Sequence, residues 1–394
     1  EYIEGGVCAA AGFMANGCHC GLDSRPEKND LGIICSETLC NAAAVYTTNQ
    51  VKGAPILVTR KNMEATRGKA RAVIVNSKNA NTCNADGEEK AWNMCELTAQ
   101  QLKITPEEVI VASTGVIGQT LPIEPIEAHI QELVSGMSPQ HHGEAAAAIM
   151  TTDTVKKEAA VSFLLDGKIC HLGGMAKGSG MIHPNMATTL NFITTDAAVS
   201  SEMLQKALSD TVKVTYNCLS VDGDTSTNDM VCVLANGLAG NAEITAENED
   251  FRIFQKALYL VLLHLTKMLA KDGEGATKLI ECTCSGAPDL DTAITAAKSV
   301  VSSSLVKSAM FGADANCGRI LCALGYAGVP LDVSKIDVSL ASEQGRVQVC
   351  GSGNGLAFSE EDAARVLSAD EIQILVDLHQ GSVSAQAWGC DLTY

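Results

Sequence analysis

The sequence contains few aromatic residues and few charged residues for its length. Of its 394 residues, 4% are aromatic and 19% are charged, whereas 46% are hydrophobic. The core must therefore be built mostly from Ala, Val, Leu and Ile, and the composition indicates a well-buried globular protein. The length allows one large domain or two to three ordinary ones.

Clusters of basic residues are also missing. The formal net charge is -18, and no run of Lys or Arg is longer than a few residues. Nucleic acids and anionic membranes bind clustered basic residues, so we expect neither as a partner. The longest apolar stretch lies near residues 258–265 and is far shorter than the roughly 20 residues of a membrane span.

The sequence contains 16 cysteines, and we expect no secretory signal to accompany them, since the first residues are acidic and lack an apolar segment. Several of them sit within apolar runs, as Cys35 does after Ile33 and Ile34. Buried free thiols of this kind indicate a reducing compartment, and we predict a cytoplasmic protein. Cys18-His19-Cys20 has no second cysteine pair at zinc-site spacing, so we predict no metal site.

Hydrophobic periodicity predicts a mixture of strands and helices. Strands rich in β-branched residues are predicted at 31–35, 43–48, 54–59, 72–75 and 109–112. Helices are predicted at 88–102, 125–134, 201–214, 251–270 and 292–310. We expect residues 251–270 to be buried and 138–143 to form a loop. The pattern favours the α/β or α+β class.

Most familiar catalytic motifs are absent from the sequence. It has no His-Glu-x-x-His, no Gly-x-Ser-x-Gly and no complete phosphate-binding or calcium-binding loop. One remaining route to nucleophilic catalysis is a threonine whose own backbone amine acts as the base. Such a threonine must begin a chain, so an internal one has to be released by backbone cleavage.

The junction Ala187-Thr188 suits this chemistry. Ala187 leaves the scissile carbonyl unobstructed, and the β-branched Thr188 has few rotamers. Pro184 restricts the approach of the chain, while Gly178 and Gly180 allow unusual backbone angles. A glycine-rich turn before a strand is the common alternative, and spacing alone favours that alternative.

Longer motifs then point to a family. Residues 177–188 read Lys-Gly-Ser-Gly-Met-Ile-His-Pro-Asn-Met-Ala-Thr, which closely resembles the self-cleavage motif of the ornithine acetyltransferase family. Further blocks resemble the same family in the same order, and together they cover essentially the whole chain. They are residues 113–118, 150–154, 220–229, 272–277, 311–316 and 388–394.

The resemblance implies a precursor that cleaves between Ala187 and Thr188. It would give an α chain of residues 1–187 and a β chain of residues 188–394 that stay associated, as an α2β2 assembly. The implied fold is two layers of sheet flanked by helices, of the N-terminal-nucleophile kind. The implied activity is acetyl transfer from N2-acetylornithine to glutamate in arginine synthesis, without a cofactor, and with acetyl-CoA as a further substrate in some members.

The resemblance also implies roles for individual residues. Thr188 would be the nucleophile and its freed amine the general base, while Thr114 and Gly115 would form the oxyanion hole. Substrate would bind to Thr151, Lys177, Thr188 and Glu274.

Three positions depart from the family pattern. Lys78 stands where the family tends to have Gly, Thr189 where a larger apolar residue is usual, and Cys317 where Trp is expected. Two other functions stay open from the sequence. An N-terminal-threonine aminopeptidase or amidase would pass the acyl group to water, and a binding protein with an inactive site would not cleave at all.

Overall fold

A computed structural model describes residues 1–183 and 189–393 of the chain. These residues divide into two compact units, each with its own β-sheet. Within the described residues, the first unit comprises 1–178, 189–212 and 225–265, and the second comprises 179–183, 213–224 and 266–393. Neither unit is continuous in sequence, so no single linker separates them.

The described residues of the first unit form a nine-stranded sheet with the order β1-β6-β7-β8-β10-β3-β4-β5, and β2 pairs with β3 off this path. Its strands are β1 (Tyr2–Ile3), β2 (Phe13–Cys18), β3 (Leu31–Tyr46), β4 (Lys69–Asn76), β5 (Val109–Ser113), β6 (Lys157–Leu165), β7 (Lys168–Lys177), β8 (Leu190–Thr195) and β10 (Met230–Ala235). Its helices are α1 (Ala54–Ala65), α2 (Gly87–Leu102), α3 (Glu124–Ser135), α4 (His142–Ala148), α5 (Ser201–Lys213) and most of α6 (Glu249–Lys271).

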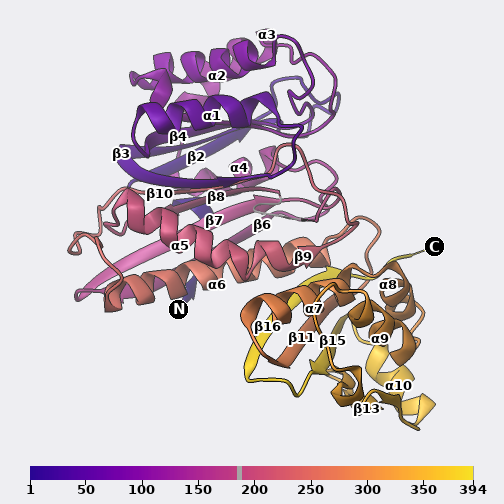
Figure 1. Cartoon of the computed structure of the whole chain (residues 1–394). Coiled ribbons are helices and arrows are strands. Elements are labelled where there is room, and N and C mark those ends of the chain that lie inside the picture. Colours follow the sequence, from indigo (N-terminus) through magenta and orange to yellow (C-terminus); the bar gives the residue numbers. More distant parts are fainter. Residues whose placement is uncertain (184–188, 394) are drawn as a thin grey trace. The chain divides into compact units, whose positions relative to one another are not determined.

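Strand β3 joins the two halves of this sheet. Its residues 31–35 pair with β4, and its residues 41–46 pair with β10. Apolar side chains from both halves meet in one core, including Ile34, Val73, Ile110, Phe192 and Cys232. Figure 1 shows the resulting layers, with α1, α2 and α3 over one half and α5 and α6 over the other. The predicted two layers of sheet flanked by helices are confirmed.

The second unit contains a seven-stranded sheet among the described residues, with the order β14-β13-β12-β15-β11-β16-β9. Its strands are β9 (Leu219–Ser220), β11 (Leu279–Ala287), β12 (Asp337–Ser342), β13 (Gly345–Gly351), β14 (Asn354–Gly355), β15 (Glu371–Asp377) and β16 (Val383–Cys390). Its helices are α7 (Leu290–Ser302), α8 (Ser304–Phe311), α9 (Cys317–Gly325) and α10 (Glu360–Leu367).

The predicted strand at 54–59 is wrong, because these residues begin helix α1. Pro55 occupies the first turn of the helix, where its missing N–H and fixed φ are favourable. The β-branched Ile56, Val58 and Thr59 that suggested a strand are buried. Burial against the core therefore outweighs the local strand propensity.

Three further boundaries differ from the prediction. The single helix expected at 292–310 is two helices, α7 and α8, separated at Ser303, whose side chain caps the second. The two strands expected at 31–35 and 43–48 are parts of the continuous strand β3. The loop expected at 138–143 contains a 3-10 turn and the start of α4.

Helix α6 is amphipathic and only partly buried, whereas the sequence predicted that residues 251–270 are buried. Phe254, Leu258 and Leu262 are fully buried, whereas Arg252 and Lys256 are exposed. Its length and composition would also suit a membrane span, but half of its most apolar window is buried within the structure. A core helix of a globular protein meets the same criterion.

All 16 cysteines are free thiols, and most are buried. Burial raises the pKa of the Cys40 and Cys218 thiols to about 12, so they remain protonated at neutral pH. Cys83 and Cys322 are the exposed thiols among them. For the buried cysteines, the prediction that free thiols pack as small hydrophobic groups is confirmed.

Alkylation of the native protein tests this arrangement. Iodoacetamide at pH 7.5 should modify Cys83 and Cys322 within minutes and leave Cys40 and Cys218 unmodified, because alkylation requires an accessible thiolate. Peptide mass spectrometry gives the labelled sites. The unfolded protein is the control and should label at all positions; fast native labelling of Cys40 would contradict the packing.

Candidate functional site

Three chain segments meet where strands β7, β8 and β10 end or begin. Lys177, the last residue of β7, pairs with Leu190, the first residue of β8. Leu190 also pairs with Met230, the first residue of β10. The register therefore places Lys177, Thr189 and Asp229 close together near the middle of the sheet.

The end of strand β5 reaches the same place. Lys177 Nζ donates a hydrogen bond to Thr114 Oγ1 at 3.2 Å, and both side chains are buried. Strand β5 lies in the other half of the sheet from β7. The two halves face each other across the shared core, so segments far apart in the sheet order come together here.

Gly115 is required by its backbone conformation and by its surroundings. Its φ is +134°, and a Cβ at this position would overlap the backbone of Lys78 and Asn79. Val116 N donates to Lys78 O at 3.0 Å, which fixes this close approach. Lys78 itself has a φ of +77°, in the region that favours glycine.

Asp153 connects Thr151 with the end of β7. One carboxylate oxygen accepts hydrogen bonds from Gly178 N at 2.7 Å and from Lys157 Nζ at 2.7 Å. The other accepts from Thr151 N at 3.0 Å. The structure thus gathers Thr114, Gly115, Thr151 and Lys177 around one buried cluster of charges.

Burial governs the electrostatics of this cluster. It lowers the pKa of Lys177, and Asp153 and Asp229 oppose that shift by favouring the ammonium form. Burial would raise the pKa of Asp153, but Lys177 and Lys157 hold it below its usual range. Asp153 is therefore ionised at neutral pH, and its charge supports that of Lys177.

Asp229 behaves differently from Asp153. Burial raises its pKa to about 7, although Thr189 N donates to its Oδ1 at 2.6 Å and Lys177 is nearby. Its Oδ2 has no hydrogen-bond partner among the residues that the structure describes. A buried carboxyl group is costly for folding, which is a common property of functional sites.

Asn228 links the surrounding loops by hydrogen bonds. Its Nδ2 donates to Ala80 O at 2.6 Å and to Ser113 O at 2.9 Å, and its Oδ1 accepts from Thr82 Oγ1 at 2.7 Å. This one side chain therefore fixes the segment before Asp229 to the end of β5.

Glu274 belongs to the second unit. Its backbone N donates to Ser179 O at 2.9 Å, and its side chain lies beside Gly180. The predicted cleavage residues Ala187 and Thr188 lie outside the described residues, whereas Thr189 lies within them.

Sequence reasoning assigned no role to Asp153, Asn228 or Asp229. They lie in the blocks 150–154 and 220–229, which we recognised as motifs without giving the polar residues a purpose. The sequence does contain a signal for Asn228 and Asp229. They end an unbroken polar run, residues 225–229, that lies directly before the apolar strand β10, where buried polar residues are unusual.

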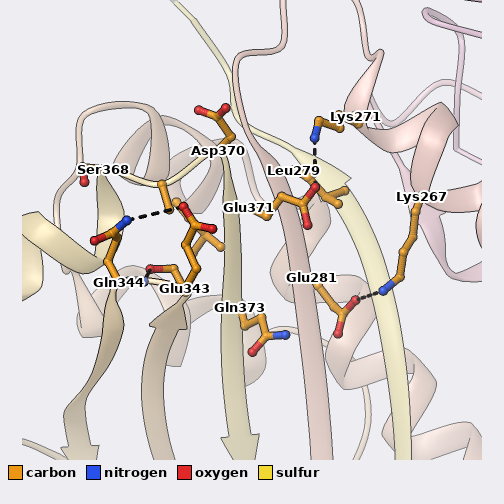
Figure 2. A pocket seen from close by; sticks show the side chains of 13 residues that line it. Lys267, Lys271, Leu279, Glu281, Glu343, Gln344, Ser368, Asp370, Glu371 and Gln373 are labelled. Atoms are coloured by element: carbon orange, nitrogen blue, oxygen red, sulfur yellow. Dashed lines mark hydrogen bonds and ion pairs between the residues drawn. The ribbon is translucent and has the colours of Figure 1, made fainter.

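A polar pocket of about 620 Å³ lies in the second unit. Figure 2 shows its two lysines in ion pairs, Lys267 with Glu281 at 2.8 Å and Lys271 with Glu371 at 2.9 Å. Glu281 also accepts a hydrogen bond from Trp388 Nε1. Because both lysines of the pocket are bound in ion pairs, we interpret it as a structural network. In the described ranges, no three His, Cys, Asp or Glu side chains could hold a metal ion.

Comparison with known proteins gives consistent matches over the whole chain. The model of the ArgJ family matches residues 14–394. The arginine biosynthesis bifunctional protein ArgJ 1 of Clostridium acetobutylicum is 51% identical, over 97% of this chain and 93% of that protein. The ArgJ protein of Symbiobacterium thermophilum is 49% identical, over 100% and 97%. A solved ornithine acetyltransferase from Mycobacterium tuberculosis, in complex with ornithine, is 37% identical over 48% of this chain and 99% of that chain, with a TM-score of 0.43.

Gly115→Ala should destabilise the first unit. The added Cβ would overlap the Lys78 carbonyl, and alanine disfavours the φ that residue 115 requires. The free energy of unfolding should therefore fall by roughly 2–4 kcal/mol. Urea unfolding measures it. Gly118→Ala is the control, because Gly118 also has a positive φ but has open space around it. Equal losses in the two variants would show that the close approach at Gly115 is unimportant.

Asp229→Asn should stabilise the protein at high pH. The carboxyl pKa is about 7 in the folded state and near the ordinary 3.8 when unfolded, so the folded state binds the extra proton between these values. The contribution of Asp229 to stability is therefore largest below pH 4 and is lost as the pH rises through 7.

Unfolding measured at several pH values tests this prediction. The gain in the free energy of unfolding of Asp229→Asn over the unmodified protein should increase from pH 5 to pH 8, towards a limit of about 4 kcal/mol, and the melting temperature should rise with it. Asp210→Asn, at an exposed ion pair with Lys206, should show no such increase. A gain that is constant with pH would contradict the raised pKa.

Proposed function

The chain belongs to the ArgJ family, and from that premise we propose that it transfers an acetyl group from N2-acetylornithine to glutamate through Thr188. It is an acetyltransferase of arginine biosynthesis, like the relatives that match along its full length. The observation that best supports the proposed mechanism is the buried hydrogen bond from Lys177 to Thr114 beside Gly115.

The Thr114 hydroxyl is suited to stabilise a developing negative charge. Its oxygen already accepts a hydrogen bond from Lys177, so its own proton is available to a different acceptor. The backbone N of Thr114 donates to Asn76 O and is not available. We therefore assign the Thr114 side chain and the Gly115 amide to the oxyanion hole, where the loss of one donor costs roughly 10²–10³ in rate.

The reaction takes place in two halves. The Thr188 hydroxyl attacks the acetyl carbonyl of N2-acetylornithine, the amide C–N bond breaks, and the proton passes through the Thr188 amine to the departing ornithine amine. The acetyl group is then an ester on Thr188. The α-amine of glutamate attacks that ester, and the C–O bond breaks to give N-acetylglutamate and the free hydroxyl.

The charges of the site suit these substrates. Lys177, kept cationic by Asp153, is assigned to a substrate carboxylate, and Thr151 lies beside it through the same aspartate. Glu274 is assigned to a substrate ammonium group. Association of the two chains as α2β2, the absence of a cofactor, the cytoplasmic location and the use of acetyl-CoA all stay predictions.

The self-cleavage step has a simple test in the mass of the purified protein. The unmodified protein should give two fragments that meet between Ala187 and Thr188, because the Thr188 hydroxyl is needed to open that bond. Thr188→Ala should give one intact chain without acetyl-transfer activity. Thr188→Ser keeps a hydroxyl and should still cleave, more slowly.

One result would contradict this mechanism. An intact, unmodified chain that transfers acetyl from N2-acetylornithine to glutamate would show that no new N-terminus is needed. Release of acetate that is independent of glutamate would instead identify an amidase. Parallel assays with acetyl-CoA and glutamate would decide whether acetyl-CoA is a second donor.

A further inference from the structure

Thr189, the residue directly after the proposed nucleophile, has an unfavourable backbone conformation. Its φ is +87°, in the region that favours glycine, although Thr is β-branched. Its side chain is buried, and Leu190 immediately begins strand β8. A conformation of this kind persists only where the surroundings enforce it, and it is concentrated at functional sites.

Three hydrogen bonds from described residues hold Thr189 in place. Its N–H donates to Asp229 Oδ1 at 2.6 Å, and its carbonyl oxygen accepts from Met230 N at 3.0 Å. Its hydroxyl accepts from Asn191 Nδ2 at 2.5 Å. Asp229 is itself held by Thr47 N, which donates to the Asp229 carbonyl at 3.0 Å.

The contact with Asp229 carries a larger desolvation penalty than the other two contacts. The carbonyl contact is a neutral hydrogen bond to the neighbouring strand β10, and the hydroxyl contact is a neutral hydrogen bond to Asn191 two residues along the chain, whereas the first uses a buried carboxyl group directly before β10. A neutral side chain would satisfy one amide at a smaller desolvation penalty. The carboxylate does bind an N–H more strongly than a neutral acceptor, about twofold in energy.

The position of this contact indicates its purpose. The Thr189 N–H belongs to the peptide unit that joins Thr189 to Thr188, so the Asp229 carboxylate fixes the plane of that peptide. Rotation of this peptide would carry the preceding residue with it. The strained φ and the buried carboxylate therefore act on the same covalent link.

We propose that Asp229 is a positioning residue for the acetyl-transfer reaction, and that its carboxylate holds the Thr189 backbone in its left-handed conformation so that the preceding residue is correctly oriented. The inference rests on the proposed function, because it takes Thr188 as the nucleophile. Asp229 acts through the Thr189 amide and does not contact the substrate.

The experiment separates positioning from simple structural support. Asp229→Ala removes the acceptor, so Thr189 should relax to a negative φ, and kcat should fall at least about 100-fold with a smaller change in KM. Thr189→Gly removes the penalty for a positive φ. In the Asp229→Ala background, the glycine should therefore recover roughly tenfold in kcat.

Thr189→Ala is the matched control. Ala and Gly both lack the hydroxyl that accepts from Asn191, and they differ only in the Cβ that disfavours a positive φ. Asp229→Ala combined with Thr189→Ala should therefore show no recovery. Each double variant is compared with its own Thr189 single variant, and circular dichroism and the melting temperature establish that each is folded.

The outcomes are distinct. Full activity of Asp229→Ala, or equal recovery by Gly and Ala at position 189, would overturn the positioning role. If Asp229→Ala does not fold, Asp229→Asn with and without Thr189→Gly replaces it. The neutral oxygen of Asn is a weaker acceptor for the Thr189 N–H than the carboxylate, so kcat should fall by less than in Asp229→Ala, and Thr189→Gly should recover part of that loss; an unchanged kcat in Asp229→Asn, or an absence of any gain from Gly, would again overturn the proposal. Failure of the unmodified protein to transfer acetyl would reject the proposed function, whereas normal transfer with unaffected Asp229 variants would reject the inference alone.

Discussion

The site depends on the burial of one ammonium group, that of Lys177. A buried lysine stays charged only when carboxylates compensate for its lost hydration, and Asp153 and Asp229 do so from two different segments. Asp153 also binds Thr151 and Gly178, so the charge balance and the position of the β7 end are set by the same side chain. The arrangement of the neighbouring residues follows from this requirement.

The fold supplies the geometry that this charge cluster needs. The long strand β3 lets one sheet form two facing layers, which brings the end of β5 to the end of β7. Asn228 and the close approach of Gly115 to Lys78 then fix the connecting loops. Burial favours a raised pKa for both Asp153 and Asp229. The pKa of Asp153 is nevertheless low, because Lys157 binds it directly and Lys177 lies nearby, whereas the pKa of Asp229, which has no such lysine contact among the described residues, is raised to about 7.

The sequence predicted the fold class, most helices and the residues Thr114, Gly115, Thr151 and Lys177 that the structure gathers. Long motifs singled out these four residues, since each of them alone has an ordinary structural explanation, and their roles stay predictions. Propensity failed at 54–59, where β-branched residues are buried in a helix, and at Ser303, where a cap divides two helices. The role of Asp229 could not be predicted, because it arises from the φ of Thr189 and from the register of β8 and β10, neither of which is a local property of the sequence.

The central claim is that the acetyl group is carried on Thr188 at this buried site. The most direct measurement is the mass of the C-terminal fragment after brief incubation with N2-acetylornithine in the absence of glutamate. The account predicts a fragment heavier by one acetyl group, located at Thr188 by peptide sequencing and discharged when glutamate is added. An unmodified fragment under conditions in which ornithine is released in a burst, or an acetyl group at another residue, would contradict it.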